Sequence, residues 1–329
     1  MRQADGIIRL GVVGAGRIAR RFVRESHYVS GVNVETVWSR TQESAERFAE
    51  AFNLSSAKSS FEELLAEVDA VHIATPHESH VPYTRQALEA GVHVLCEKPI
   101  ALHAAELPEL YALADAKGLV LLEALKTAFA PGFQRMIAIA RSGTIGSIRS
   151  VDATFTKLIR SGREVDSPAG GAITELASYP LLAILKLLGE EPSEVVSRAF
   201  KPAGSLVEQF ARIDLEYPHA IATAKVGIGV KAEGDLVVAG TRGYLYVPSP
   251  WWLTEYFETR FEDPRENRKY YFKYDGDGLR YELAEFAGMI RDGAPESFKL
   301  RRHESQTIAE LIERARTTPR IFGAEHEEG

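Results

Sequence analysis

The chain has 329 residues, of which 45% are hydrophobic and 26% are charged. At roughly 150 residues per domain, this length predicts two globular domains. The net charge of −7 argues against a nucleic-acid binder, which would carry a basic stripe. No run approaches the roughly 18 apolar residues of a membrane span. The single cysteine, Cys96, has no internal partner, and the N-terminal residues lack the apolar stretch of a signal peptide, so we expect a cytoplasmic protein.

The first third of the chain alternates short apolar strands with amphipathic helices. The predicted strands are Ile7–Val13, Val34–Trp38, Ala70–Thr75, His93–Cys96 and Val120–Leu122. The predicted helices between them are Arg17–Glu25, Gln42–Phe52, a short helix after Ser60, Val81–Ala90 and Ala104–Lys117. Strand–helix units of this length imply parallel strands with helical crossovers. We therefore expect a Rossmann-type doubly wound parallel sheet over residues 1–123.

Beyond residue 124 the pattern changes to alternating strands joined by short turns. The predicted strands are Ser150–Leu158, Val207–Tyr217, Ile221–Val230, Leu236–Ala239, Tyr244–Val247, Tyr256–Phe261 and Lys269–Tyr274. The predicted helices are Gln134–Ser142, Glu175–Leu188, Arg280–Arg291 and Gln306–Arg316. Such strands favour a large, mainly antiparallel open sheet. We expect a second α/β domain over residues 124–329, whose last helices pack on its sheet or return to the first domain.

A glycine-rich motif lies between the first predicted strand and the first predicted helix. It reads Gly14-Ala-Gly16-Arg17-Ile18-Ala19 and matches G-x-G-x-x-G/A in its required context. The first glycine permits a tight turn, the second admits a pyrophosphate, and the small alanine allows close packing of helix on strand. The helix N-terminus then offers free N–H groups to the phosphates. The motif predicts a dinucleotide cofactor, bound by Gly14, Gly16, Arg17 and Ile18.

The end of the second strand distinguishes between nicotinamide cofactors. NAD enzymes usually place an acidic residue there to bind the ribose 2′-hydroxyl. This chain has Ser39 and Arg40 instead, and Glu35 falls too early in the strand. A guanidinium makes charge-assisted bonds to a 2′-phosphate. We therefore expect a preference for NADP(H), with NAD(H) possible if Arg40 is only a solvated loop residue.

Polar residues also follow the ends of later parallel strands, where doubly wound folds bind ligands. Glu97 and Lys98 come directly after the predicted strand His93–Cys96 and precede Pro99, and Thr75 ends the predicted strand Ala70–Thr75, with Pro76 and His80 after it. An ammonium fixed before a proline is suited to act on a substrate oxygen, although the tripeptide alone is equally consistent with a surface turn. Both groups are candidates for the cofactor cleft.

Taken together, these motifs resemble the glucose–fructose oxidoreductase, inositol dehydrogenase and rhizopine-catabolism (Gfo/Idh/MocA) family. The resemblance rests on Gly14–Ala19, on Thr75-Pro76 with His80, and on Glu97-Lys98-Pro99. Two further segments, Glu123–Pro131 and Gly170–Tyr179, are similar to the dimeric dihydrodiol dehydrogenase branch. The resemblance covers nearly the whole chain, including the change to an antiparallel C-terminal sheet. It implies an NADP-dependent dehydrogenase or reductase that moves hydride between CH–OH and C=O groups.

The resemblance also implies a catalytic set, namely Lys98, Glu175 and Tyr179. Glu175 and Tyr179 are spaced i, i+4, which places them on one helix face. A phenol normally titrates near about pH 10, so Tyr179 needs a neighbouring cation to act as a base, and Lys98 is the expected source. Lys98 would also polarise the carbonyl during reduction. Without the resemblance, the structural interpretation is favoured, with Glu175 as a helix cap and Tyr179 as a half-buried residue.

The sequence departs from the family where the substrate is expected to bind. Glu175 replaces the usual aspartate, Tyr179 replaces the common histidine, and Lys126 stands where the dihydrodiol branch has an apolar or aromatic residue. If Lys126 faces the pocket, its charge favours a polar or anionic substrate over an aromatic diol. If it points to solvent, it has no such effect. Phe155 and Lys157 are the other candidate substrate contacts.

The expected function is hydride transfer between NADP(H) and a small polyol, sugar or related carbonyl compound. The alternatives are a trans-dihydrodiol dehydrogenase proper and a catalytically idle NADP-binding regulator. We expect no metal site, no nucleic-acid or membrane partner, and a homodimer or homotetramer formed through the C-terminal sheet.

Overall fold

The computed structural model describes residues 6–323, which form two compact units. The first unit contains the described residues up to Phe129 together with Asp275–Ser305. The second contains Ala130–Tyr274 and the described residues from Gln306 onward. The chain therefore passes between the units three times. The segment Asp275–Ser305, which carries a predicted helix, belongs to the first unit.

The first unit is built on a six-stranded parallel sheet in the order β3-β2-β1-β4-β5-β6. Its strands are β1 (Ile8–Val13), β2 (Val32–Trp38), β3 (Ser56–Ala57), β4 (Ala70–Ile73), β5 (His93–Glu97) and β6 (Leu121–Ala124). Its α-helices are α1 (Arg17–Ser26), α2 (Gln42–Phe52), α3 (Phe61–Glu67), α4 (His80–Glu89), α5 (Leu107–Lys117) and α10 (Leu279–Asp292). Short 3₁₀ turns are η1 (His77–Ser79), η2 (Ala104–Glu106) and η3 (Lys126–Phe129). The predicted doubly wound sheet is confirmed.

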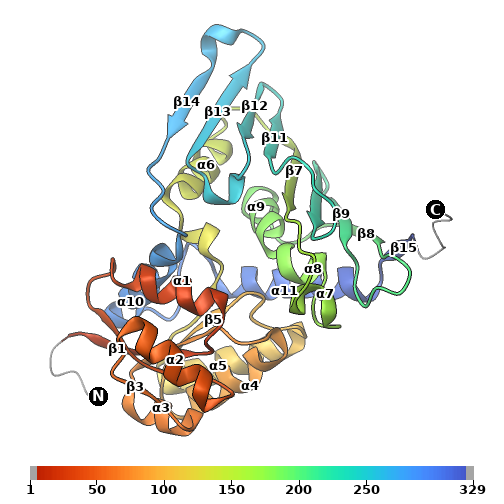
Figure 1. Ribbon diagram of the computed structural model, residues 1–329. Coiled ribbons are helices and arrows are strands. Elements are labelled where there is room, and N and C mark those ends of the chain that lie inside the picture. The colour runs from red at the N-terminus through yellow and green to blue at the C-terminus, as the bar shows by residue number, and fades with distance from the viewer. Residues whose placement is uncertain (1–5, 324–329) are drawn as a thin grey trace. The chain divides into compact units, whose positions relative to one another are not determined.

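Helices cover both faces of this sheet, as the lower part of Figure 1 shows. Helices α1, α2 and α10 lie on one face, where Arg20 of α1 stacks on Phe48 of α2 and Arg280 of α10 pairs with Glu25 of α1. Helices α3, α4 and α5 lie on the other face. Val12, Val71, Val94 and Leu95 in the strands between them are fully buried. This burial on both faces explains why the strands read as continuous apolar runs rather than alternating ones.

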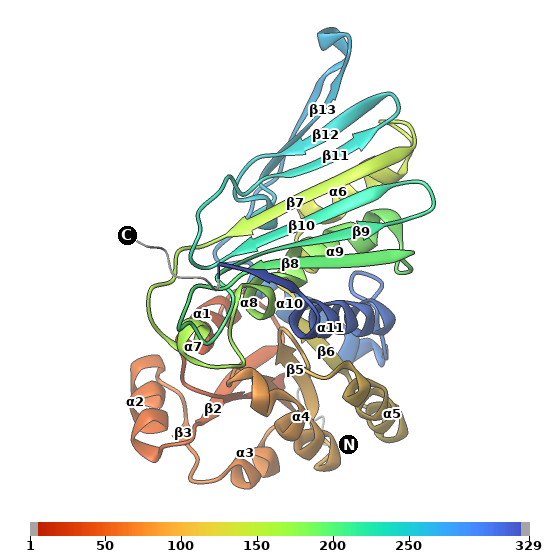
Figure 2. The ribbon, with the colours of Figure 1, turned by 90° about the vertical axis from the view of Figure 1, so that its right-hand side faces the viewer.

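The second unit is built on a nine-stranded sheet in the order β14-β13-β12-β11-β7-β10-β9-β8-β15 (Figure 2). Its strands are β7 (Ile148–Thr156), β8 (Glu194–Phe200), β9 (Phe210–Glu216), β10 (Ile221–Gly227), β11 (Leu236–Gly240), β12 (Gly243–Val247), β13 (Tyr256–Phe261), β14 (Arg268–Tyr271) and β15 (Arg320–Phe322). The pairs β7–β10 and β8–β15 are parallel, and the others are antiparallel. The predicted, mainly antiparallel open sheet is confirmed.

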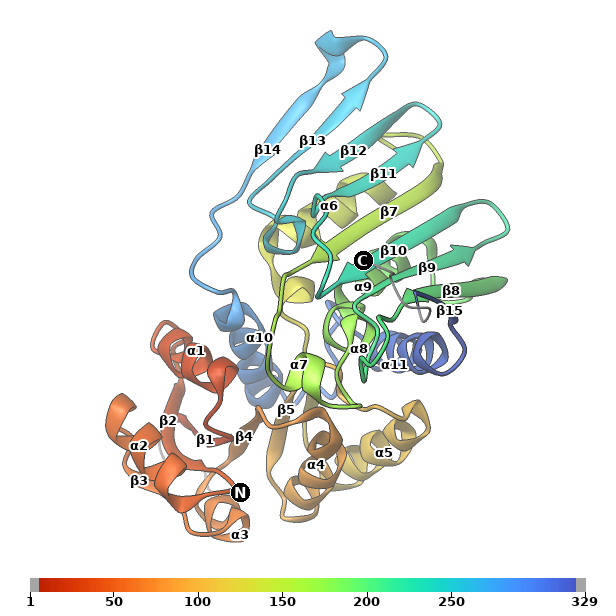
Figure 3. The ribbon, with the colours of Figure 1, turned by 45° about the vertical axis from the view of Figure 1, so that its right-hand side comes forward.

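Helices cover one face of the second sheet. They are α6 (Pro131–Arg141), α8 (Ala172–Leu176), α9 (Ser178–Leu188) and the end of α11 (Arg302–Thr317). The short helix α7 (Arg163–Asp166) follows β7 and has no buried residue, and the 3₁₀ turns are η4 (Trp251–Leu253) and η5 (Pro264–Glu266). Helices α8 and α9 contact the central strands β7 and β10, and α6 packs on α9 (Figure 3). The other face carries exposed side chains such as Asp152, Arg198, Arg212 and Tyr244. The alternation predicted from sequence therefore marks one covered and one open face.

The prediction of a single helix over Glu175–Leu188 is wrong in one respect. The structure divides it into α8 and α9 at Ala177. Pro180 has no N–H to donate to the carbonyl of Leu176, so one helical hydrogen bond is lost at this point. Ala177 nevertheless keeps φ −67° and ψ −23°, and the chain continues its right-handed turn through the break.

Candidate functional site

The glycine turn after β1 is fixed by contacts with both neighbouring strands. Gly14 adopts a φ of +107°, a region that side-chain-bearing residues rarely enter. A Cβ atom there would lie 2.5 Å from the carbonyl oxygen of Ala74 at the end of β4. The N–H of Gly14 donates to the carbonyl oxygen of Trp38 at 2.8 Å, which holds the turn against the end of β2. The turn therefore requires glycine at this position.

Gly16 opens helix α1 and leaves its first turn accessible. It is the N-cap residue, and no side chain caps the helix. A Cβ atom added to Gly16 would meet nothing within 4 Å, and the backbone of Gly16 is exposed. Arg17 is exposed, Ile18 is half-buried and Ala19 is fully buried against the sheet. An exposed helix N-terminus with open space in front of its N–H groups fits a pyrophosphate.

Ser39 and Arg40 follow β2, beside the glycine turn. The Ser39 hydroxyl donates to the carbonyl oxygen of Thr41 at 3.0 Å. Arg40 is exposed, and among the described residues no hydrogen bond or ion pair holds its guanidinium. The hydrogen bond from Gly14 to Trp38 keeps this strand end next to the turn. A free cation beside a dinucleotide turn is suited to bind a further phosphate.

His80 connects the ends of β4 and β5. Its Nε2 lies 3.0 Å from the carbonyl oxygen of Thr75, and its Nδ1 lies 2.8 Å from that of Pro99. The side chain is fully buried, and burial lowers its pKa to about 4. His80 is therefore neutral at physiological pH and donates through one ring nitrogen. Thr75 is half-buried, with its hydroxyl accepting from Ser79 at 2.8 Å, and Pro76 is exposed.

Lys98 is the accessible residue in an otherwise buried segment. From Val94 to Ala101 every other residue is buried, whereas Lys98 is half-buried. Its neighbour Glu97 turns inward, where Oε1 lies 3.4 Å from Nε2 of His72. Burial opposes ionisation of Glu97, but the nearby His72 ring and the charge of Lys98 lower its pKa below the ordinary value. The strand end thus presents one ammonium beside one buried carboxylate.

Lys126 lies in η3, close to the ends of β5 and β6. Its Nζ donates to the carbonyl oxygen of Asp277 at 2.6 Å. Glu282 of α10 is fully buried nearby, and burial together with the charge of Glu97 raises the pKa of its carboxyl group well above the ordinary value. Burial lowers the pKa of Lys126, although Glu282 and Asp277 oppose this effect. The ammonium is therefore engaged inside the first unit, and its contact with substrate stays a prediction.

In the second unit, Glu175 and Tyr179 stand out by their exposure. Every other residue from Gly171 to Leu185 is buried, whereas these two are half-buried. Glu175 lies in α8 and Tyr179 at the second position of α9. Two polar side chains four residues apart therefore form the accessible part of an apolar helical segment. Their buried neighbours fix the backbone of both residues.

Tyr179 is held by an aromatic cluster. Its ring meets Phe155 of β7 edge to face, with 5.1 Å between ring centroids. Phe155 in turn stacks on Trp252 of η4 at 3.6 Å and is itself buried. Lys157, predicted to contact substrate, is exposed just beyond β7, where its N–H donates to the carbonyl oxygen of Gly227 at 2.8 Å. Edge-to-face packing orients the phenol without using its hydroxyl.

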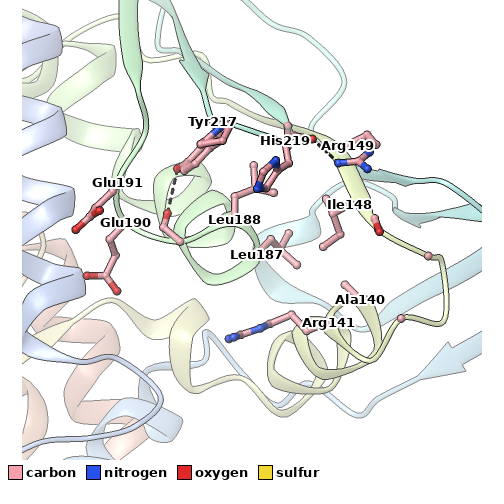
Figure 4. Close-up of a pocket in the computed structure, with 16 residues that line it drawn as sticks. Ala140, Arg141, Ile148, Arg149, Leu187, Leu188, Glu190, Glu191, Tyr217 and His219 are labelled. Atoms are coloured by element: carbon pink, nitrogen blue, oxygen red, sulfur yellow. Dashed lines mark hydrogen bonds between the residues drawn. The ribbon is translucent and has the colours of Figure 1, made fainter.

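A cavity of about 900 Å³ lies elsewhere in the second unit (Figure 4). It lies between the ends of α6 and α9 and the β9–β10 turn, where the Tyr217 hydroxyl donates to the carbonyl oxygen of Gly189 at 3.1 Å. Its charged lining is Arg141, Arg149, Glu190 and Glu191. Helix C-termini carry partial negative charge and disfavour phosphate. The cavity contains no predicted site residue.

A glycine turn at the carboxyl edge of a parallel sheet, joined to a unit with a large antiparallel sheet, defines a dinucleotide-binding protein of two units. The oxidoreductase family with an NAD-binding Rossmann fold matches residues 8–125, and the GFO/IDH/MocA C-terminal domain matches residues 133–246. The chain belongs to the Gfo/Idh/MocA family of oxidoreductases. This confirms the predicted family and the predicted class of enzyme.

Relatives match almost the full chain. Trans-1,2-dihydrobenzene-1,2-diol dehydrogenase of Mus musculus is 32% identical over 320 residues, covering 94% of this chain and 96% of the mouse protein. A 3-ketoreductase from Actinomadura kijaniata, solved with NADP and TDP-benzene, is 25% identical with a TM-score of 0.86, covering 96% of this chain and 98% of that chain. UDP-N-acetylglucosamine 3-dehydrogenase from Acidithiobacillus ferrooxidans, at 23% identity and a TM-score of 0.81, shares the fold over 95% of this chain and 98% of that chain.

Two structural observations concern other ligands and environments. Within residues 6–323, no group of three or more His, Cys, Asp or Glu side chains is arranged to hold a metal ion. None of the helices that the structure describes is long and apolar enough to cross a membrane.

Sequence reasoning missed two residues close to the predicted ones. Trp252 stacks on Phe155 from a 3₁₀ turn that has no periodic pattern. Glu123, quoted only as part of a motif, accepts a hydrogen bond from the N–H of Ile100 in the turn that carries Lys98. An acidic residue inside the apolar strand Leu121–Ala124 was the available signal, because a buried carboxylate needs partners.

Proposed function

We propose that the protein is an NADP(H)-dependent dehydrogenase or reductase acting on a small polyol, sugar or related hydroxy or carbonyl compound. The observation that carries the proposal is the carboxyl edge of the first sheet, where Gly14 and Gly16, the exposed guanidinium of Arg40, and Lys98 follow β1, β2 and β5. The strands of this sheet are parallel, so these groups come to one edge, which is where doubly wound sheets bind dinucleotides.

The cofactor proposal assigns the phosphates to the first unit. Gly14, Gly16, Arg17 and Ile18 would hold the pyrophosphate, and Ser39 with Arg40 the 2′-phosphate. Thr75, Pro76, Glu97 and Lys98 would line the nicotinamide end. His80 is buried, so it would act by fixing the two strand ends rather than by touching the cofactor. The complex of the related 3-ketoreductase with NADP supports this choice of cofactor.

We propose that Lys98 of the first unit, and Glu175 and Tyr179 of the second, take part in the hydride transfer. When bound, the reduced nicotinamide supplies a hydride to a carbonyl carbon. Lys98 would polarise the carbonyl oxygen through its ammonium. Tyr179 would deliver the proton that this oxygen needs as it becomes a hydroxyl, and would remove that proton in the oxidative direction. Glu175 would orient the substrate by accepting hydrogen bonds from its hydroxyl groups.

A substrate screen tests the proposal. Polyols, aldoses, sugar acids, nucleotide sugars and diketones would be offered with NADP⁺ or NADPH and followed at the nicotinamide absorbance. Turnover of one class above the others supports the proposal. Tight NADPH binding with no turnover across the panel would contradict it in favour of the idle regulator.

Sequence identity and an aromatic cluster favour a second candidate, a trans-dihydrodiol dehydrogenase proper. The mouse relative is 32% identical, and the Phe155–Tyr179–Trp252 cluster offers aromatic rings to a flat hydrocarbon ring. The ammonium of Lys126, which would have opposed an aromatic diol, is already bound to Asp277. A cyclohexadiene trans-diol therefore belongs in the screen, and its preference over sugars would select this candidate.

Arg40→Ala is expected to weaken NADPH binding by roughly ten- to a hundredfold, because it removes a charge-assisted bond of about 1.5–3 kcal/mol. NADH has no 2′-phosphate, so its binding should change little. Fluorescence titration with both cofactors measures the difference. Arg47→Ala is the matched control, since Arg47 is exposed on α2 and pairs with Glu43. An unchanged ratio of NADPH to NADH affinity in Arg40→Ala would remove Arg40 from the cofactor site.

We also propose a homodimer or homotetramer formed through the open face of the second sheet. In register across that face lie Asp214, Thr223, Asp152, Val237, Tyr246 and Glu258. Arg260 lies over the Tyr246 ring at 4.8 Å, and Tyr and Arg are enriched in protein interfaces. Sedimentation equilibrium should give two or four chains, and Tyr246→Lys should raise the monomer fraction. A wild-type monomer at micromolar concentration would contradict the proposal.

A further inference from the structure

Glu123 reaches from the neighbouring strand to the turn that carries Lys98. It lies in β6, where it pairs in register with Cys96 of β5, and its side chain is buried at 2% exposure. Its Oε1 accepts a hydrogen bond from the N–H of Ile100 at 3.1 Å. The carboxyl group therefore fixes the backbone two residues beyond Lys98, at the point where β5 gives way to the turn.

The two buried carboxylates beside Lys98 approach it from opposite faces of the sheet. Glu97 points to the face covered by α1 and α10, where His72 stacks on Phe22 of α1 at 3.7 Å. Glu123 points to the face covered by α5, where it and Tyr111 line the same small cavity. The charge of Lys98 lowers the pKa of each carboxyl group, against the effect of burial.

Several ionisable and polar groups surround Glu123 and influence its pKa. They are Cys96 and Glu97 on β5, Lys98 in the turn, Tyr111 on α5, Glu296 before α11, and Arg302 and Ser305 on α11. Burial raises the pKa values of Cys96 and Tyr111, so both stay neutral. Burial likewise raises the pKa of Glu123, to about 7, against the opposing effects of Ser305, the Ile100 N–H and Lys98.

We propose that Glu123 is a positioning residue for Lys98: its buried carboxyl group anchors, through the N–H of Ile100, the turn that presents the Lys98 ammonium to the substrate. The inference rests on the proposed function for its catalytic consequence. Its structural part, the hydrogen bond from Ile100 to Glu123, does not depend on any substrate.

Glu123→Gln and Glu123→Ala separate the hydrogen bond from the charge, because the amide oxygen of glutamine can still accept from Ile100 whereas alanine offers no acceptor. In the full chain, exchange of the Ile100 amide proton, followed by NMR, is expected to be roughly tenfold faster in Glu123→Ala and to change little in Glu123→Gln. Glu208→Ala is the matched control, since Glu208 accepts a backbone N–H from Ile173 in the second unit, and it should leave the exchange of the Ile100 amide unchanged.

Kinetics supply the second measurement. Wild-type kcat/KM is expected to show an inflection near pH 7 that disappears in Glu123→Gln. Glu123→Ala, which also leaves the Ile100 N–H without an acceptor, should lower kcat further. Wild-type exchange of the Ile100 amide together with wild-type kcat in Glu123→Ala would overturn the inference. Absence of turnover in the wild type would instead refute the proposed function, and the exchange of the Ile100 amide would still decide whether Glu123 anchors the turn.

Discussion

Lys98→Ala is expected to lower kcat by roughly a hundred- to a thousandfold, the loss typical of removing one group that stabilises developing negative charge on oxygen. Lys98 is the accessible residue of the segment Val94–Ala101, and the buried residues around it fix its backbone. The alanine variant should therefore fold and bind NADPH, because the glycine turn and Arg40 are untouched. Stopped-flow measurement of NADPH oxidation with the substrate found by the screen gives the rate.

Lys117→Ala provides the comparison for that experiment. Lys117 is an exposed lysine on α5 that donates to the carbonyl oxygen of Glu89 at 2.8 Å, and its loss should leave kcat unchanged. Lys98→Arg keeps the positive charge but changes its shape and reach, so it should recover part of the rate. Wild-type turnover in Lys98→Ala would exclude Lys98 from the chemistry.

Tyr179→Phe is expected to lower kcat by roughly two to four orders of magnitude, the range for a positioned acid or base. Phenylalanine keeps the edge-to-face contact with Phe155 and removes only the hydroxyl group. The loss should therefore appear in kcat, while the affinity for NADPH and the thermal midpoint change little. Single-turnover kinetics with saturating NADPH separate the chemical step from binding.

Tyr217→Phe is the matched control in the same unit. Tyr217 donates its hydroxyl to the carbonyl oxygen of Gly189, at the opposite end of α9 from Tyr179, so the variant loses a hydrogen bond but should keep its rate. The cost to stability is about 1 kcal/mol. If Tyr179→Phe and Tyr217→Phe turned over equally fast, another group would have to transfer the proton.

Local patterns were sufficient to predict most of the fold. The buried parallel strands of the first unit appear as apolar runs separated by helices, and β13 occupies the residues predicted for it. Strand β8 was missed because two of its inward-facing residues are Ser197 and Ala199, which weaken the apolar alternation. Strand β15 is exposed at the sheet edge and carries no alternation at all. Pro180 was a visible signal for the break at Ala177.

The same difference between local and long-range signals applies to the candidate site. The positions of Gly14, Gly16 and Lys98 in the fold could be predicted, because the turn, the helix N-terminus and the strand end are local features. The environment of Lys126 was not, because its partner Asp277 lies 151 residues further along the chain. His80 was predicted to line the cofactor cleft, yet it is buried between two carbonyl oxygens that only the parallel pairing of β4 and β5 brings together.

The interleaving of the two units has a consequence for the order in which the protein is made. Glu25 of α1 is buried, and its guanidinium partner Arg280 arrives only with α10, after β7–β14 have been synthesised. A nascent first unit ending at Phe129 would lack α10, so Glu25 would remain in water and the surface that buries Leu283 and Phe286 of α10 would stay uncovered, which opposes stable folding. The first unit is therefore completed late in translation, and an excised Rossmann fragment or an exchange of units between relatives must keep the segment Asp275–Ser305 with its first 129 residues.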